Sequence, residues 1–193
     1  PQGAGLYASV VFRPPLLSPV LTLMSGVALV EAIRCRVGLA VVLKWPNDLI
    51  VKRGVNRKLG GILAEAGASP TGVKYVVVGF GINLLAASNL SALSVTATSI
   101  ESECGEVVPL ADLLVEVLAA LAVWRARMVD GQMNAILNRW RTLSPSSIAS
   151  TVELDGPSGV RRGTTAGIDT DGALLVRVNG TTERVVSGEV RWV

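Results

Sequence analysis

The sequence predicts an α+β domain followed by a small all-β unit. Residues 1–143 contain helical patterns together with apolar runs of strand length, whereas residues 144–193 contain short β segments punctuated by glycine and aspartate. The chain has 193 residues, of which 50% are hydrophobic and 17% are charged. That length and composition suffice for one full domain and a small appendage. We therefore expect a core domain at 1–143 and a second domain at 144–193.

The first part of the core is predicted as a strand followed by a helix. Residues 6–12 read as a strand entered through two glycines, which permit a sharp turn or a close approach of the backbone to a ligand. A Ser-Pro pair at 18–19 is a favourable helix start, and the helical pattern continues to about residue 36. Gly38 is the predicted stop of that helix.

The middle of the core is predicted as a series of short strands. The apolar run 39–43 reads as a buried strand, and Pro46 ends its pairing, so that the chain turns before a second strand begins. The predicted elements of this region are strands at 41–44 and 47–51, a polar turn at 53–57, and a hairpin of strands 59–66 and 73–80.

Two helices and a group of short strands complete the chain. The helix predicted at 109–128 is strongly apolar, so its apolar face is either core or a dimer surface that the C-terminal unit leaves uncovered. A second helix is predicted at 132–143. The strands expected behind it form a small barrel after a linker, and they lie at 151–154, 162–168, 173–178 and 182–186.

Composition excludes several classes of function. The chain has no histidine, which removes a Ser-His-Asp triad and any His-ligated metal, so no protein-only metal cluster is expected. Its two cysteines, Cys35 and Cys104, predict neither a zinc site nor a disulfide framework. The net charge of +3 is spread along the chain, with no basic run typical of nucleic-acid binding and no membrane span. A cytoplasmic protein is the default expectation. The tryptophans are expected in the core or at an interface, at 45, 124, 140 and 192.

The segment Lys44-Trp45-Pro46-Asn47-Asp48 concentrates a cation, an amide and a carboxylate in a mostly apolar chain. A lysine at the end of a buried strand is expected to point into a cleft, where its ammonium suits a carboxylate or phosphate. Capping of a strand end in solvent is the alternative for Lys44. Asp48 and Asn47 are either ligands of Mg²⁺ and orienting groups, or turn formers after the proline, and the sequence does not separate these two roles.

Segments along the whole chain resemble biotin protein ligases, in the order of that family. They are the strand entry PQGAGLYASV at 1–10, KWPNDL at 44–49, KLGGILAE at 58–65 and GFGINL at 79–84, and the tail 167–190 is similar to the small C-terminal barrel of that family. The resemblance implies a core like that of class II aminoacyl-tRNA synthetases and an SH3-like barrel. It implies ligation of biotin, through biotinyl-5'-AMP, to a lysine of a biotin carboxyl carrier protein domain, with ATP and Mg²⁺. A homodimer is left open.

The resemblance also implies roles for individual residues. Lys44 is expected to hold the biotin carboxylate and the α-phosphate of ATP together, and Asn83 to bind adenine, since an amide can pair with the N6 and N7 positions of that base. The strand with Gly60 and Gly61 is expected to line the biotin pocket, with a bulge or tight packing as the alternative. Lys58 either reaches phosphate or is a solvated lysine.

Some features of the family pattern are missing from this sequence. Biotin ligases carry a Ser-Thr-Asn segment and a Gly-Arg-Gly-Arg-type loop upstream of the position of Pro1, and neither is in this chain. An N-terminally truncated ligase is therefore expected. The alternatives are a non-catalytic fragment that keeps the fold and part of a nucleotide site, or a relative of the lipoate and octanoate transferases. Near the C-terminus, Arg191 is the residue that could replace an arginine that the family often places there.

Overall fold

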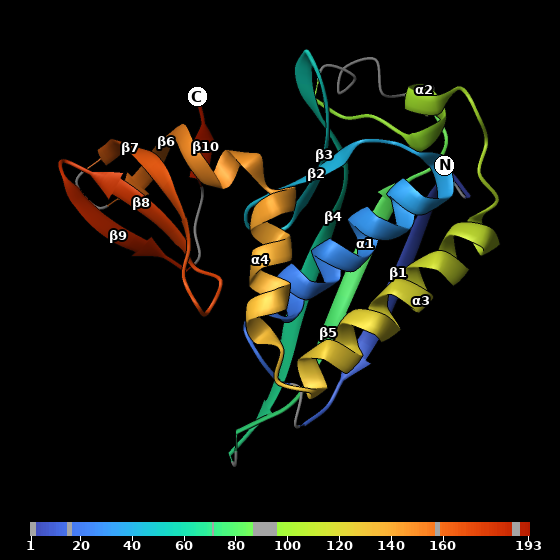
Figure 1. Ribbon diagram of the computed structural model, residues 1–193, viewed down its shortest axis with the longest axis horizontal. Helices are drawn as coiled ribbons and strands as arrows, with labels where there is room; N and C mark the ends of the chain where they lie inside the picture. The colour runs from blue at the N-terminus through green and yellow to red at the C-terminus, as the bar shows by residue number, and fades with distance from the viewer. Residues whose placement is uncertain (1–2, 15–16, 71, 87–95, 157–158, 187–189) are drawn as a thin grey trace.

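The core of the protein is an antiparallel β-sheet covered by helices on one face. The computed structural model describes residues 3–14, 17–70, 72–86, 96–156, 159–186 and 190–193. The sheet has five strands in the order β1-β5-β4-β3-β2, and helix α1, Leu21–Val37, lies across it (Figure 1). The bounds of the strands are β1 Gly5–Phe12, β2 Val41–Lys44, β3 Asp48–Arg53, β4 Val55–Ser69 and β5 Gly72–Asn83.

The helices form the second layer of the core. Helix α1, Leu21–Val37, is buried around most of its circumference because it lies between the sheet and the other two long helices. Gly26 allows it to approach the sheet closely, since a Cβ there would lie 3.1 Å from Leu43. The other helices are α2 Ile100–Cys104, α3 Leu110–Val129 and α4 Met133–Leu143.

The alternation of side chains along the strands separates a core face from an open face. Leu6 of β1 and Phe80 and Ile82 of β5 face the helices and are almost fully buried. Their neighbours on the opposite face include Tyr7, which is 73% exposed, and Leu63, which is 61% exposed. No described helix covers this second face, so it is accessible to ligands along the middle of the sheet.

The C-terminal unit is a second antiparallel sheet, which begins after the short helix η1 Pro145–Ser147. Its order is β10-β6-β7-β8-β9, and within the described residues the outer strands β9 and β10 do not pair with each other. The predicted closed barrel is therefore not confirmed, and a fifth, very short strand joins the four expected ones. Their bounds are β6 Ile148–Gly156, β7 Gly159–Ile168, β8 Leu174–Val178, β9 Thr181–Val185 and β10 Val190–Trp192.

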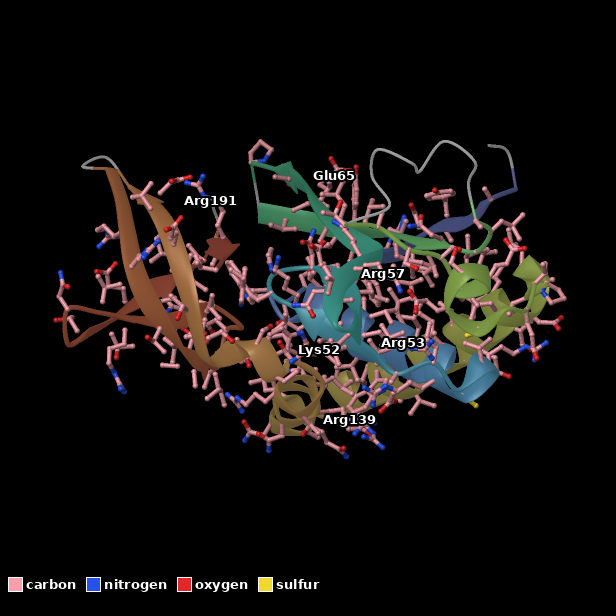
Figure 2. All side chains as sticks on the ribbon, turned by 90° about the horizontal axis from the view of Figure 1, so that it is seen from above. Lys52, Arg53, Arg57, Glu65, Arg139 and Arg191 are labelled. Carbon is pink, nitrogen blue, oxygen red and sulfur yellow. The ribbon has the colours of Figure 1, made fainter. Side chains whose placement is uncertain are left out.

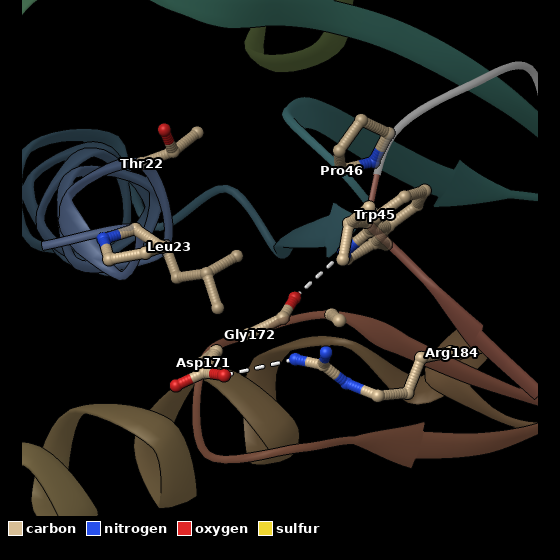
Figure 3. Close-up of a pocket in the computed structure, with 10 residues that line it drawn as sticks. Thr22, Leu23, Trp45, Pro46, Asp171, Gly172 and Arg184 are labelled. Atoms are coloured by element: carbon tan, nitrogen blue, oxygen red, sulfur yellow. Dashed lines mark hydrogen bonds and ion pairs between the residues drawn. The ribbon is translucent and has the colours of Figure 1, made fainter.

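A tight loop of the C-terminal sheet fixes it to the core. The indole N–H of Trp45 donates to the carbonyl of Gly172, 3.0 Å away, and both lie beside Leu23 of α1 (Figure 3). On the other side of the loop, Arg141 of α4 donates to the carbonyl of Ile168 at 2.9 Å. The C-terminal sheet thus contacts both α4 and the turn between β2 and β3 (Figure 1).

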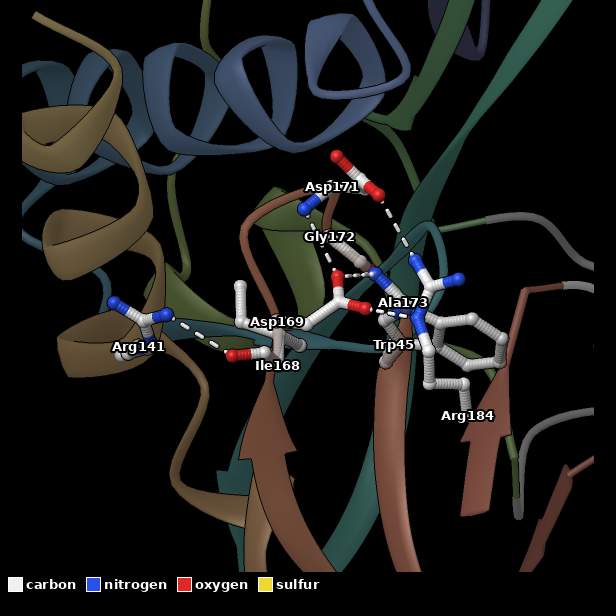
Figure 4. A network of polar contacts seen from close by, with 8 residues as sticks. All are labelled: Trp45, Arg141, Ile168, Asp169, Asp171, Gly172, Ala173 and Arg184. Carbon is white, nitrogen blue, oxygen red and sulfur yellow. Dashed lines mark hydrogen bonds and ion pairs between the residues drawn. The ribbon is translucent and has the colours of Figure 1, made fainter.

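An aspartate organises this loop. The Asp169 carboxylate accepts the backbone N–H groups of Asp171 and Ala173 at 2.9 and 3.0 Å, and Arg184 of β9 pairs with both Asp169 and Asp171 (Figure 4). Burial raises the pKa of Asp169, but the hydrogen bonds from Arg184 and the two amides outweigh it, so the net pKa is lowered. The carboxylate is therefore held in its ionised form.

Several boundaries differ from the sequence prediction. The polar turn predicted at 53–57 is wrong: β3 continues to Arg53 and β4 begins at Val55, because the polar side chains lie on a solvent-exposed hairpin. Helix α1 begins at Leu21 rather than at 18, since the Ser18 hydroxyl accepts the N–H of Val20 ahead of the first turn. Helix α2 was not predicted, and residues 87–95 before it lie outside the described residues, as do 1–2 and 187–189 of the quoted motifs.

Other predictions agree with the structure. The helices predicted at 109–128 and 132–143 are confirmed as α3 and α4, and both cysteines are free. The inner side of α3 is core, while its outer side leaves apolar residues exposed, among them Val115 and Val123. No helix in the described part of the chain is long and apolar enough to cross a membrane.

Candidate functional site

One row of residues crosses all five strands of the core sheet on its open face. The strand registers pair Tyr7 with Gly81, Gly81 with Gly61, Gly61 with Asp48, and Asp48 with Lys44. Directly paired residues of antiparallel strands point to the same side of a sheet. The fold therefore places Lys44 and Asp48 at one end of the row and the ring of Tyr7 at the other, with the two glycines between them.

The glycines of this row keep the middle of the open face free of side chains. Together with Gly79 they form the floor of a shallow cavity of about 340 Å³. The Tyr7 ring lies over Gly81, where an added Cβ would come within 3.0 Å of it. Side chains from three elements line the rest of the cavity, among them Asn47, Lys58 and Leu63. The space is shaped for a flat, mostly apolar group lying on the sheet.

Gly60 and Gly61 serve different purposes. Gly61 is in the row and lines the cavity, in the position expected from the sequence. Gly60 lies in the neighbouring row with Leu49 and Ile82, which faces the helices. A Cβ on Gly60 would lie 2.2 Å from the carbonyl oxygen of Gly81, so this glycine allows two strands to approach each other. For Gly60 the packing explanation therefore holds. A β-bulge lies next to it: Leu59 has no pairing partner in β3, because Leu49 pairs with Gly60 and Ile50 pairs with Lys58.

Three lysines line a second cavity beside the first, of about 520 Å³, and Lys58 borders both. Lys44 and Lys52 come from β2 and β3, and the carboxylate of Asp48 lies among them. Lys58 forms an ion pair with Asp48, 2.5 Å between Nζ and Oδ1. The described charges of this cavity are thus positive in sum, which favours an anionic ligand. Figure 2 shows Lys52 with Arg53 and Arg57 on the β3–β4 hairpin.

Asn47 is used inside the protein. Its amide donates to the carbonyl of Ile62 at 2.5 Å, and the Ile62 N–H donates back to the Asn47 carbonyl at 3.0 Å. These two bonds fix the turn between β2 and β3 against β4. Lys44 and Asp48, on either side of this turn, line the second, lysine-lined cavity. These bonds are what a turn-forming residue makes, and a role of Asn47 as an orienting group or magnesium ligand stays a prediction.

No protein site for Mg²⁺ is visible in the described residues. They contain no group of three acidic, cysteine or histidine side chains close enough to hold a metal ion. Asp48, the acidic residue expected to take this role, is engaged by Lys58.

Asn83 lies at the end of β5 and is held by a segment that the sequence did not single out. Its amide donates to the carbonyl of Thr98 at 2.9 Å, and the Thr98 N–H donates to the carbonyl of Lys58, also at 2.9 Å. The Thr98 hydroxyl donates to the buried carboxylate of Glu103 at 2.6 Å, which Arg57 pairs with at 2.8 Å. Asn83 and Lys58 are thus fixed by one common segment.

Similar structures define the class of this fold. The biotin protein ligase of Aquifex aeolicus superposes with a TM-score of 0.83 at 22% identity, covering 98% of this chain and 82% of that one. The same ligase in complex with biotin and ATP gives a TM-score of 0.82 at 22% identity, with 98% and 78% covered. At this identity the likeness establishes the fold: a mixed α/β fold of the biotin protein ligase type.

Sequence comparisons identify the family. Residues 1–83 match the model of the biotin/lipoate A/B protein ligase family. The biotin–[acetyl-CoA-carboxylase] ligase of Paracoccus denitrificans is 32% identical over 202 residues, which cover 97% of this chain and 80% of that protein. The chain belongs to the biotin protein ligase family. The bifunctional ligase/repressor BirA of Bacillus subtilis is 29% identical over 98% of this chain, which spans only 58% of that protein's length.

Proposed function

We propose that this chain forms the adenylation and transfer site of a biotin ligase. The substrates are biotin and ATP with its Mg²⁺, and the acceptor is a lysine of a biotin carboxyl carrier protein domain. The observation that carries the proposal is the cross-strand row on the open face, because it joins a side-chain-free floor to a lysine at the edge of a positive cavity. Membership of the family supports the same reading.

The proposed chemistry has two steps. In the first, a carboxylate oxygen of biotin attacks the α-phosphorus of ATP, and pyrophosphate leaves, which gives biotinyl-5'-AMP. In the second, the amine of the carrier lysine attacks the acyl carbon, AMP leaves, and the amine loses its proton. Both reactants of the first step are anions, and negative charge increases as they approach. A fixed ammonium, that of Lys44, lowers this barrier by electrostatic stabilisation.

The other residues of the site position the substrates in this proposal. The glycine floor and Tyr7 take the ring system of biotin, and its valeryl chain runs along the row toward Lys44. Asn83 contacts the adenine, and Lys58 lies where the two cavities meet and faces the phosphates. Asp48 holds Lys58 in place, so its contribution is to orient that side chain.

The finer assignments belong to the same proposal. A core domain at 1–143 and a second domain at 144–193 are supported by the separate sheets on either side of η1. The relationship of the core to class II aminoacyl-tRNA synthetases follows from the family resemblance. The homodimer and the cytoplasmic location expected from the sequence stay predictions.

The adenylation step can be tested without a carrier. The protein is incubated with biotin and MgATP, and biotinyl-5'-AMP is quantified by mass spectrometry. Lys44→Ala is expected to reduce adenylate formation by about 10²-fold or more, on the scale of losing a key electrostatic contact. Lys74→Ala, at an exposed position at the start of β5, is the matched control and should match the unaltered protein. Equal rates for the two variants would contradict the role of Lys44.

A second candidate is transfer of a lipoyl or octanoyl group, because the matching family model includes lipoate ligases. The same adenylation assay with lipoate or octanoate in place of biotin decides between them. The biotin proposal predicts a clear preference for biotin at equal concentrations. A preference for the straight-chain or dithiolane acid would replace it.

A further inference from the structure

The last strand of the chain places an aromatic ring on the lysine of the site. Lys44 Nζ lies 4.7 Å from the centroid of the Trp192 ring, within the range of a cation–π contact. The two residues are on different sheets, since Lys44 ends β2 and Trp192 ends β10. Trp192 is also part of the wall of the lysine-lined cavity, together with Pro145 and Ser146 of η1.

The geometry of β10 determines which side chain reaches Lys44. Trp192 is half-buried, and its indole N–H donates to the carbonyl of Ser146 at 3.4 Å. Arg191 is exposed and pairs with Asp155 of β6 (Figure 2 labels Arg191). Successive side chains of a strand point to opposite faces. Arg191 therefore points away from Lys44, and Trp192 is the residue of β10 that lies beside it.

An aromatic partner has a specific consequence for Lys44. The nearby carboxylate, that of Asp48, is paired with Lys58, so Lys44 is held by a neutral group. A carboxylate partner would neutralise the ammonium and compete with the carboxylate and phosphate of the substrates. The face of an indole ring attracts the ammonium and restricts its position, yet leaves its full charge available to an anion.

We propose that Trp192 is a positioning residue, which holds the Lys44 ammonium at the edge of the cavity for the adenylation step. This inference rests on the proposed function. It assigns the C-terminal sheet a direct part in the site, because the ring belongs to that sheet while the lysine belongs to the core. The next residue in the chain, Trp45, makes a second contact with the C-terminal sheet through its hydrogen bond to Gly172.

Three variants test the kinetic part of the proposal. Trp192→Leu removes the ring, Trp192→Phe keeps an aromatic face, and Arg191→Gln removes the ion pair of the neighbouring residue without changing the ring. Adenylate formation is measured at varied biotin and ATP concentrations. Loss of a contact of this kind is expected to lower kcat by about 10-fold in Trp192→Leu, with both KM values changed by less than about threefold. Trp192→Phe should recover most of the activity, and Arg191→Gln should behave as the unaltered protein.

A readout independent of catalysis tests the contact itself. The ring current of an indole shifts the ε-CH₂ resonance of a lysine placed over it, and this resonance can be followed in protein carrying ¹³C-labelled lysine and assigned with Lys44→Arg. The shift is expected in the unaltered protein and in Arg191→Gln, and it should disappear in Trp192→Leu. Thermal denaturation of each variant confirms that it is folded.

The outcomes separate this inference from the proposed function. A shifted Lys44 resonance in a protein that makes no adenylate would overturn the proposed function but support the Trp192 contact. An unshifted resonance, or a Trp192→Leu variant as active as the unaltered protein, would overturn the positioning role. A Trp192→Leu variant more active than the unaltered protein would also overturn it, because the ring would then obstruct the lysine.

Discussion

The two adjacent glycines of β4 are predicted to respond differently to the same substitution. Gly60→Ala places a methyl group 2.2 Å from the Gly81 carbonyl, where the strands must separate, and overpacking of this kind costs about 1–3 kcal/mol of unfolding free energy. A methyl group on Gly61 meets only ordinary contacts, the nearest at 3.4 Å. The unfolding free energy of Gly61→Ala should therefore stay within about 0.5 kcal/mol of that of the unaltered protein.

Ligand binding should show the opposite order for these variants. Gly61→Ala stands on the floor of the open-face cavity and should weaken biotin binding, measured by calorimetry, while the protein remains stable. Gly60→Ala should lower the midpoint of thermal unfolding first. If Gly61→Ala bound biotin as well as the unaltered protein, the ligand would not lie on this floor.

At the scale of elements, the segment around Thr98 is predicted to control the position of Asn83. Thr98→Val keeps the backbone contacts to Asn83 and Lys58 but removes the hydroxyl that donates to Glu103, whose Oε2 already has no hydrogen-bond partner. Loss of a hydrogen bond to a buried carboxylate should cost about 1–3 kcal/mol of unfolding free energy. We also expect weaker ATP binding with little change in biotin binding, measured by calorimetry.

The control for this prediction is Glu106→Gln. This variant changes an exposed carboxylate just after α2, the short helix that contains Glu103. It should leave both stability and ATP affinity unchanged. Equal loss of ATP and biotin affinity in Thr98→Val would indicate general loosening of the fold instead of a local effect on Asn83.

The loop between β7 and β8 predicts a pH dependence for the docking of the C-terminal sheet. The pKa of Asp169 is lower in the folded protein than its unfolded value of about 4. Its ionised carboxylate therefore contributes stability above that unfolded value, and the contribution is lost as the pH falls through the folded pKa. Asp169→Asn should lower the midpoint of thermal unfolding at neutral pH, and the difference from the unaltered protein should shrink below about pH 4.

Asp155→Asn is the matched control, since it removes an exposed pairing with Arg191 on the same sheet. Exposed ion pairs contribute little to stability, so its effect should be small at every pH. An Asp169→Asn variant whose deficit stayed constant between pH 7 and pH 3 would show that the charge of this carboxylate does not stabilise the loop.

At the scale of the whole molecule, the sequence predicted local features better than long-range ones. Pro46 and the apolar run before it predicted the two strands that flank the turn, because both signals act on neighbouring residues. The cross-strand row could not be predicted from the sequence. The register of β3 against β4 depends on a bulge at Leu59, and no local sequence pattern indicates that bulge. The contact between Lys44 and Trp192 joins residues far apart in the chain and depends on how two sheets dock.

The site residues divide in the same way. Lys44, Asp48, Lys58 and Gly61 line the two neighbouring cavities, and their roles toward substrates stay predictions. The contacts of Thr98 and Trp192 with the proposed site residues, and that of Glu103 with Arg57, were not predicted, because each joins distant parts of the chain. The predicted barrel is an open sheet in the described residues, since turns and short strands indicate an all-β unit but not whether its edges meet.

The central claim is that this chain ligates biotin to a carrier lysine by means of Lys44. Its most direct test is the intact mass of a biotin carrier domain after incubation with the protein, biotin and MgATP. We predict a biotinyl mass increase with the unaltered protein and with Lys74→Ala, and one that forms about 10²-fold more slowly with Lys44→Ala. An unchanged carrier mass with folded protein, or an equal increase with Lys44→Ala, would contradict the account.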